Sequence, residues 1–168
     1  MNKNKSVREY LLASIPFFVQ RAARLEGVRR IGLVGSILTN KQNPKDIDFL
    51  LTVDDEVDLE PLARLGRKVK GAAQQINHGA DIFLRNAEGM YIGRTCHWRE
   101  CGWGRVRCDA LNCGKRLYLH DDLNAVALSE ETMLSSMELW PKLEHREGLP
   151  TDLGNVIARL GHDPQNHT

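Results

Sequence analysis

The pattern of apolar and polar positions predicts helices and strands in alternation along most of the chain. Apolar residues recur at helical spacing over residues 6–14 and 58–77. Two shorter apolar runs, at 28–34 and 49–53, have the length of buried strands, and another run begins at Asp81. This order of strand, helix and strand predicts an α+β protein in which a mixed sheet is flanked by helices.

Turn and capping residues indicate where the expected helices begin and end. We expect Ser14 to cap a second helix that has Pro16 in its first turn and ends near Gly27. We expect Asp58 to cap the next helix, in which Pro61 lies in the first turn, where its missing N–H is tolerated. Each helix has an apolar stripe that can pack against the sheet.

The C-terminal third has a less regular pattern. Residues 115–120 and 123–128 are expected to form short strands. Ser129 is a helix start, and the apolar residues between it and Pro141 predict one continuous helix. A last short helix is expected to begin at Thr151.

Composition and charge narrow the class of protein. At 168 residues, with 42% hydrophobic and 27% charged residues, the chain is expected to form one soluble domain over residues 1–168. We divide it into a core of about 28–85, a cysteine-rich segment at 94–116, and a C-terminal strand and helices at 117–160. The net charge of +1 gives no bulk attraction to long nucleic acid or to a membrane. No signal-like apolar segment follows the polar N-terminus, so we expect a cytoplasmic protein.

Two aspartates stand at the start of the second expected strand. Side chains alternate along a strand, so Asp46 and Asp48 face the same way, with Cα atoms roughly 7 Å apart. Ile47 and Phe49 then face the opposite side and can pack in a core. Paired carboxylates on an apolar strand are costly unless a cation lies between them, and Mg²⁺ prefers such oxygen ligands.

The same stretch resembles a known family. Gly35-Ser36, a polar loop, Asp46-Ile47-Asp48 and the later strand residue Asp81 are similar to the signature of the nucleotidyltransferase (DNA polymerase β-like) superfamily, and most similar to its minimal nucleotidyltransferases. The resemblance covers residues 31–84, about a third of the chain. It implies a nucleotidyltransferase-like mixed sheet, with the cysteine-rich segment as an insertion or extension.

The resemblance also implies an activity and its residues. A nucleoside monophosphate would move from a nucleoside triphosphate such as ATP to an acceptor hydroxyl. Asp46, Asp48 and Asp81 would be catalytic and would hold two Mg²⁺ ions, while Gly35 and Ser36 would bind the triphosphate. Without metal, three carboxylates held this close should repel one another and raise the pKa of at least one of them. The acceptor would be a small molecule, a protein or an RNA end. Because minimal nucleotidyltransferases often act in toxin–antitoxin systems, a helical antitoxin-like protein is a candidate partner.

The loop after Gly35-Ser36 departs from the family pattern. Minimal nucleotidyltransferases usually have small and basic residues there, often including an arginine, whereas this chain has Ile37-Leu38-Thr39. Phosphate charge would then be neutralised by Lys41 or Lys45. The departure leaves open an alternative of another class, a non-catalytic binding module on the same fold with a zinc-stabilised interaction surface.

Four cysteines fall within eighteen residues of the cysteine-rich segment, namely Cys96, Cys101, Cys108 and Cys113. In a chain with no export signal they are expected to be metal ligands or reduced thiols rather than disulfides. A tetrahedral zinc site is one interpretation, with His97 and His120 as substitute ligands. Four small buried hydrophobic side chains are the other, because the spacing lacks a Cys-x2-Cys pair.

Overall fold

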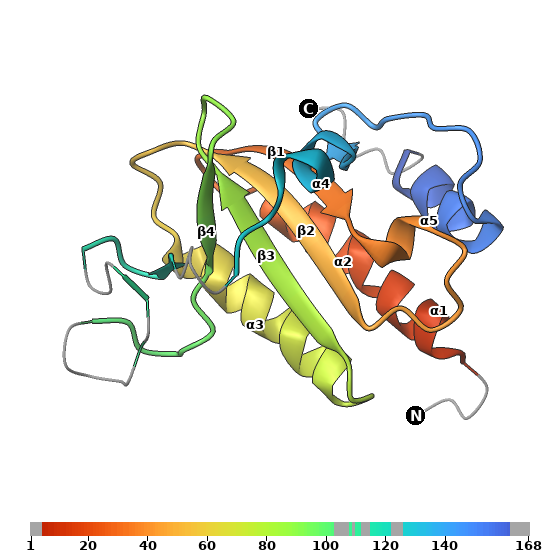
Figure 1. Ribbon diagram of the computed structural model, residues 1–168, viewed down its shortest axis with the longest axis horizontal. Helices are drawn as coiled ribbons and strands as arrows, with labels where there is room; N and C mark the ends of the chain where they lie inside the picture. The colour runs from red at the N-terminus through yellow and green to blue at the C-terminus, as the bar shows by residue number, and fades with distance from the viewer. Residues whose placement is uncertain (1–4, 103–107, 109, 112–114, 122–125, 162–168) are drawn as a thin grey trace.

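A mixed sheet forms the centre of the molecule (Figure 1). The computed structural model describes residues 5–102, 108, 110–111, 115–121 and 126–161. Within these residues, six strands lie in the order β5-β4-β3-β2-β1-β6. They are β1 (Val28–Val34), β2 (Asp46–Val53), β3 (Gly79–Arg85), β4 (Tyr91–Thr95), β5 (Leu119–His120) and β6 (Met137–Trp140). The β2–β3 pair is parallel and the other neighbouring pairs are antiparallel, so the expected α+β class with a mixed sheet is confirmed.

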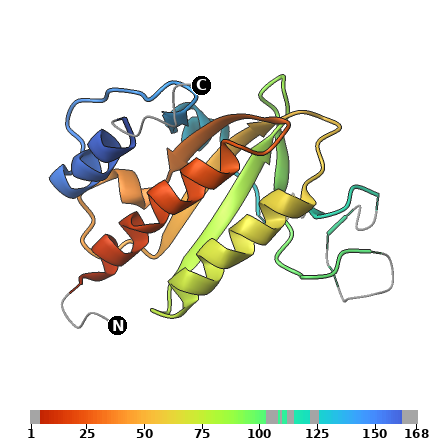
Figure 2. The ribbon, with the colours of Figure 1, turned by 180° about the vertical axis from the view of Figure 1, so that it is seen from behind.

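Helices flank this sheet. They are α1 (Val7–Leu12), α2 (Ser14–Ala22), the 3₁₀ helix η1 (Ser36–Leu38), α3 (Glu60–Gln74), α4 (Glu130–Leu134) and α5 (Thr151–Gly161). Figure 2 shows α1 and α2 end to end, with α3 beside them, across one face of the sheet. None of the helices in the described part of the chain is long and apolar enough to cross a membrane.

Alternation along β2 separates an apolar face from a face that contains the aspartates. Ile47, Phe49 and Leu51 are completely buried in the main core. The centroid of the Phe49 ring lies 4.2 Å from the centroid of the Phe18 ring of α2. Asp46 and Asp48 therefore point to the opposite face. A smaller apolar cluster covers part of that face, made up of Val34, Leu50 and Phe83 with the partly buried Tyr91, Val126, Leu128 and Met133.

The helix boundaries follow the capping signals in most places. Ser6 caps α1 through a reciprocal pair of hydrogen bonds with Glu9, and the Asp58 carboxylate accepts a hydrogen bond from the Glu60 N–H at the start of α3. The expectation that Ser14 caps α2 is wrong. Its hydroxyl instead donates to the Leu11 carbonyl oxygen at 2.6 Å, because α2 follows α1 with only Ala13 between them.

The structure corrects two predictions in the C-terminal third. The described part of 123–128, residues 126–128, is irregular rather than a strand, and it packs over the smaller apolar cluster. The continuous helix predicted after Ser129 is also wrong, because α4 ends at Leu134 and β6 begins at Met137. Strand β6 forms the edge of the sheet beside β1, and backbone hydrogen bonds to β1 satisfy groups that a single isolated helix turn would leave unpaired.

A buried arginine ties the loop after β1 to two helices. Arg8 of α1 is only 4% exposed. Its Nη2 and Nη1 donate to the carbonyl oxygens of Ile37 and Lys41 at 3.0 and 3.1 Å, and its Nε donates to Asp152 of α5 at 2.6 Å. Burial alone would raise the pKa of Asp152, but the Arg8 and Leu153 hydrogen bonds outweigh it, and the pKa is lowered.

Replacing Arg8 tests how strongly this connection stabilises the fold. Arg8→Met leaves one carboxylate and two carbonyl groups without their donor, so we expect a loss of about 2–4 kcal/mol in the free energy of unfolding, measured by urea denaturation. Arg64→Met is the control, because Arg64 makes an exposed ion pair with Glu60 one turn away, worth about 0.5 kcal/mol. Equal losses in the two variants would contradict the role given to Arg8.

Candidate functional site

The parallel register of β2 and β3 brings two of the predicted aspartates together. Asp48 lies directly opposite Asp81, and the Asp81 backbone N–H donates to Asp48 Oδ1 at 3.1 Å. Asp46 precedes Asp48 by two residues and lies opposite Gly79. The three aspartates therefore occupy the same face of adjacent strands, the face opposite to α2 and α3.

Gly35 and Ser36 lie beside Asp48. The last residue of β1, Val34, pairs with Asp48, so the chain turns at Gly35 directly next to the carboxylate. Gly35 has a φ of +83°, which a residue with a side chain rarely adopts, and a Cβ there would lie 3.7 Å from Asp48 Oδ2. Ser36 begins η1, a single 3₁₀ turn, where its carbonyl oxygen accepts hydrogen bonds from Thr39.

Two positively charged side chains, which the sequence pattern did not identify, form ion pairs with Asp81. Lys70 Nζ lies 3.4 Å and Arg94 Nη1 lies 3.2 Å from Asp81 Oδ1. All three side chains are less than a third exposed, so these ion pairs are only partly screened by water. Lys70 comes from α3 and Arg94 from β4, so the charges meet only because the two elements both pack against β3.

A glycine inside α3 is the sequence signal that could have pointed to Lys70. A Cβ at Gly66 would lie 2.9 Å from Ile82 and 3.0 Å from Thr95, so the absence of a side chain lets α3 approach β3 and β4 closely. Lys70 follows four residues later on the same face of the helix. Arg94 offered no such signal, because β4 was not predicted from its sequence.

The electrostatic environment disfavours a negative charge on Asp48. Burial is the main cause that raises its pKa, to about 7, and repulsion from Asp81 and then Asp46 adds to it. The hydrogen bond from the Asp81 N–H and the charge of Lys70 act in the opposite direction but are weaker. The direction agrees with the expectation that at least one of the three carboxylates has a raised pKa, but burial is a larger cause than the repulsion on which that expectation was based.

The three carboxylates share a face without forming a compact group. Asp46 is exposed, and its carboxylate lies against the backbone of Gly79, where any Cβ would collide with it. Asp81 is turned toward its two cations. Among the residues that the structure describes, the one set of three or more Cys, His, Asp or Glu ligand atoms that all lie within 4.8 Å of one another is elsewhere, at Cys96, Cys108 and His120.

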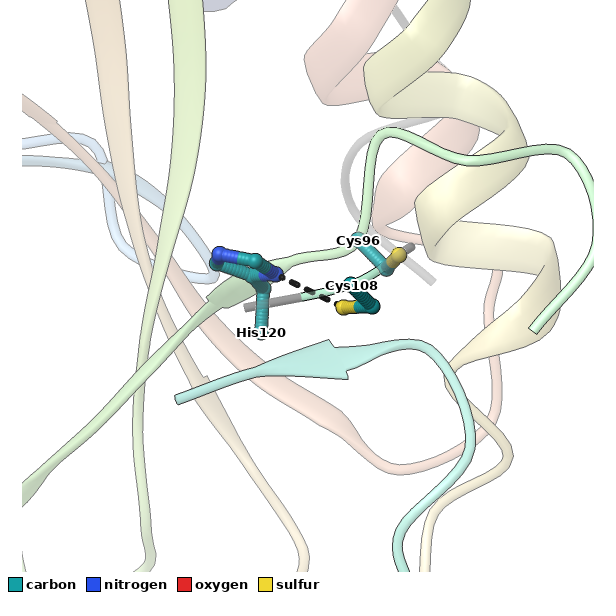
Figure 3. Close-up of side chains that lie close together, drawn as sticks. All are labelled: Cys96, Cys108 and His120. Carbon is teal, nitrogen blue, oxygen red and sulfur yellow. Dashed lines mark hydrogen bonds between the residues drawn. The ribbon is translucent and has the colours of Figure 1, made fainter. Parts of the chain in front are cut away.

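That second group lies where β4 and β5 meet (Figure 3). Cys96 directly follows β4, and His120 ends β5; their exposed fractions are only 2% and 1%. Cys108 Sγ lies 3.6 Å from His120 Nδ1. Burial raises the pKa of Cys96, and the nearby thiols of Cys101 and Cys108 raise it further, while the Trp98 backbone acts in the opposite direction.

Some of the ligands predicted for zinc lie together in the structure and others do not. The structure brings together Cys96 and Cys108 with His120, which the sequence offered only as a substitute, and it leaves His97 exposed with its ring 5.7 Å from that of His120. Cys113 lies outside the described residues.

Comparison with known proteins identifies the family. Residues 2–114 match a family of unknown function, DUF6932, and this match covers more than half of the chain, so the chain belongs to that family. The matched range includes the three aspartates and Cys96 to Cys113, and it ends before His120. No curated protein and no solved structure matches the chain.

The raised pKa of Asp48 predicts a pH-dependent effect of Asp48→Asn on stability. The folded state keeps a proton on Asp48 up to a pH of about 7, whereas the unfolded chain loses it near 3.8, so this group destabilises the fold increasingly as the pH rises between these values. The variant should therefore gain stability relative to wild type over this interval, by at most about 4 kcal/mol, and the gain should be constant above pH 8. Urea denaturation without added divalent cations measures it.

Asp55→Asn is the matched control, because Asp55 is exposed in the turn after β2. Its stability relative to wild type should not vary with pH over the same interval. If the stability of Asp48→Asn relative to wild type also did not vary with pH, Asp48 would not lie in an environment that disfavours its charge.

Proposed function

We propose that this protein is a metal-dependent nucleotidyltransferase that moves a nucleoside monophosphate from a nucleoside triphosphate to an acceptor hydroxyl. The proposal is supported most strongly by the register of β2 and β3, which sets Asp48 opposite Asp81 on the face that also contains Asp46. The Gly35-Ser36 turn beside Asp48 adds to it, because the two features occur together in the family that the sequence resembles.

The chemistry of the donor set fits Mg²⁺. All three side chains offer carboxylate oxygens, which are the ligands that Mg²⁺ prefers. The pKa of Asp48 is raised mainly by burial and then by repulsion from Asp81 and Asp46, and the charge of a bound divalent ion would oppose both effects. Asp46 and Asp48 would hold the ion, since an exposed side chain such as Asp46 can change rotamer at little cost. Two bound Mg²⁺ ions would neutralise charge on the attacking and leaving oxygens.

Asp81 would complete the second metal position and accept the proton of the acceptor hydroxyl. It would exchange its ion pairs with Lys70 and Arg94 for these new partners. The two cations would then turn to the phosphate oxygens, in place of the loop arginine that the sequence lacks. They are better placed for this than Lys41 and Lys45, both of which are exposed.

One observation favours a second candidate, a non-catalytic binding module on the same fold. Asp81 already has its charge balanced by Lys70 and Arg94, and the three carboxylates do not converge. In such a module these ion pairs would fasten α3 and β4 to β3, and no nucleotide would bind. The two candidates differ in whether a metal and a nucleoside triphosphate stabilise the protein together.

A thermal-shift experiment with each of the four nucleoside triphosphates and Mg²⁺ or Mn²⁺ separates these candidates. For an enzyme, binding to the folded state alone should stabilise it by about 2.7 kcal/mol at a hundredfold excess over the Kd, seen as a rise in Tm that requires both metal and nucleotide. Asp48→Asn should abolish this rise and also the transfer of label from an α-³²P nucleotide.

Asp55→Asn again serves as the control and should keep both the Tm shift and the transfer. An unchanged wild-type Tm with every metal and nucleotide would favour the binding module. So would a shift that survives in Asp48→Asn, because the nucleotide would then bind away from the aspartates.

A further inference from the structure

The group formed by Cys96, Cys108 and His120 has the geometry of an incomplete tetrahedral metal site. The three ligand atoms all lie within 4.8 Å of one another. The residues come from the end of β4, from β5 and from the segment between them, and Cys108 Sγ faces the His120 ring (Figure 3). Cys96 and His120 are almost completely buried, which is typical of a structural metal site rather than of an open catalytic one. Thiolate and imidazole ligands in a closed site suit Zn²⁺.

The backbone of Tyr118 links Cys101, which is not one of these three residues, to Cys96. Its carbonyl oxygen accepts a hydrogen bond from the Cys96 N–H at 2.8 Å, and its own N–H donates to Cys101 Sγ at 3.1 Å. Cys96 and Cys101 are thus tied to the same residue, two positions before His120. Tyr118 has a φ of +64°, a strained value for a bulky residue that persists only where its surroundings hold it.

We propose that this protein binds one structural Zn²⁺ ion through Cys96, Cys101, Cys108 and His120. The N–H donated to Cys101 Sγ would stabilise the negative charge of a zinc-bound thiolate. This site is independent of the nucleotidyltransferase proposal, because it shares no ligand with the aspartates.

The zinc ion would fasten the outer edge of the sheet. Strand β5 has only two residues and lies at the edge, so its backbone pairing with β4 is a weak anchor. The close approach of the two strands depends on Gly93, because a Cβ there would lie 2.5 Å from the His120 carbonyl oxygen. His120 pairs with Arg94, whose side chain reaches Asp81, so the zinc site would also fix the backbone that positions this arginine.

Metal analysis of the full chain tests the proposal. Protein purified under reducing conditions without added zinc should contain one zinc per chain by plasma emission spectrometry. Exchange with Co²⁺ should give the intense visible absorption of a tetrahedral site and the charge-transfer band of cobalt–thiolate bonds. Stoichiometric metal should be lost in each single variant of a proposed ligand, namely Cys96→Ser, Cys101→Ser, Cys108→Ser and His120→Asn.

Cys113→Ser and His145→Gln are the matched controls and should keep the zinc, since His145 is exposed and far along the chain from the site. The Co²⁺ spectrum of the wild type tests the coordination even where a variant fails to fold. Wild-type protein with reduced thiols but no zinc, or Co²⁺ without thiolate bands, would overturn the proposal. Loss of zinc in Cys113→Ser with retention in Cys101→Ser would overturn the assignment of Cys101.

Discussion

The parallel pairing of β2 with β3 is the constraint on which the candidate site depends. In this register Ile47 and Phe49 enter the main core beneath the helices, while Asp46 and Asp48 face away from it and Asp48 meets Asp81. A slip of one residue would turn the aspartates of β2 into the apolar core and expose the residues that now fill it. The packing of the core therefore fixes where the carboxylates lie, although none of them contributes to it.

Contacts made by residues distant in the sequence hold the structure on both sides of these strands. On the β1 side, buried Arg8 fixes the loop that follows Gly35. On the β4 side, Arg94 and Lys70 balance the charge of Asp81, and the cysteine–histidine cluster lies at the end of the strand that contains Arg94. Asp48 and Asp81 thus lie between two stabilised sides of the sheet, where burial and then the neighbouring carboxylates raise the pKa of Asp48.

The inner strands β1, β2 and β3 could be predicted because they contain apolar runs, and the shared face of Asp46 and Asp48 follows from alternation alone. The partner of each strand could not be predicted, so the pairs of Asp81 with Lys70 and Arg94 were missed. Strand β6 was predicted as part of a helix because Met133 and Met137 also fit the spacing of a helical stripe. Only the pairing with β1 decides between helical and strand periodicity here. His120 was ranked below Cys113 as a zinc ligand because its approach to Cys96 depends on the pairing of β4 and β5.

The proposed metal–nucleotide site at Asp46, Asp48 and Asp81 can be tested by a crystal structure with Mn²⁺ and a non-hydrolysable nucleoside triphosphate. Anomalous scattering would distinguish each Mn²⁺ ion from water and lighter ions. We expect Mn²⁺ bound by Asp46 and Asp48 beside the Gly35-Ser36 turn, with Lys70 and Arg94 moved from Asp81 to the phosphate oxygens. Mn²⁺ absent from this face, with Asp81 still paired to both cations at full nucleotide occupancy elsewhere, would contradict it.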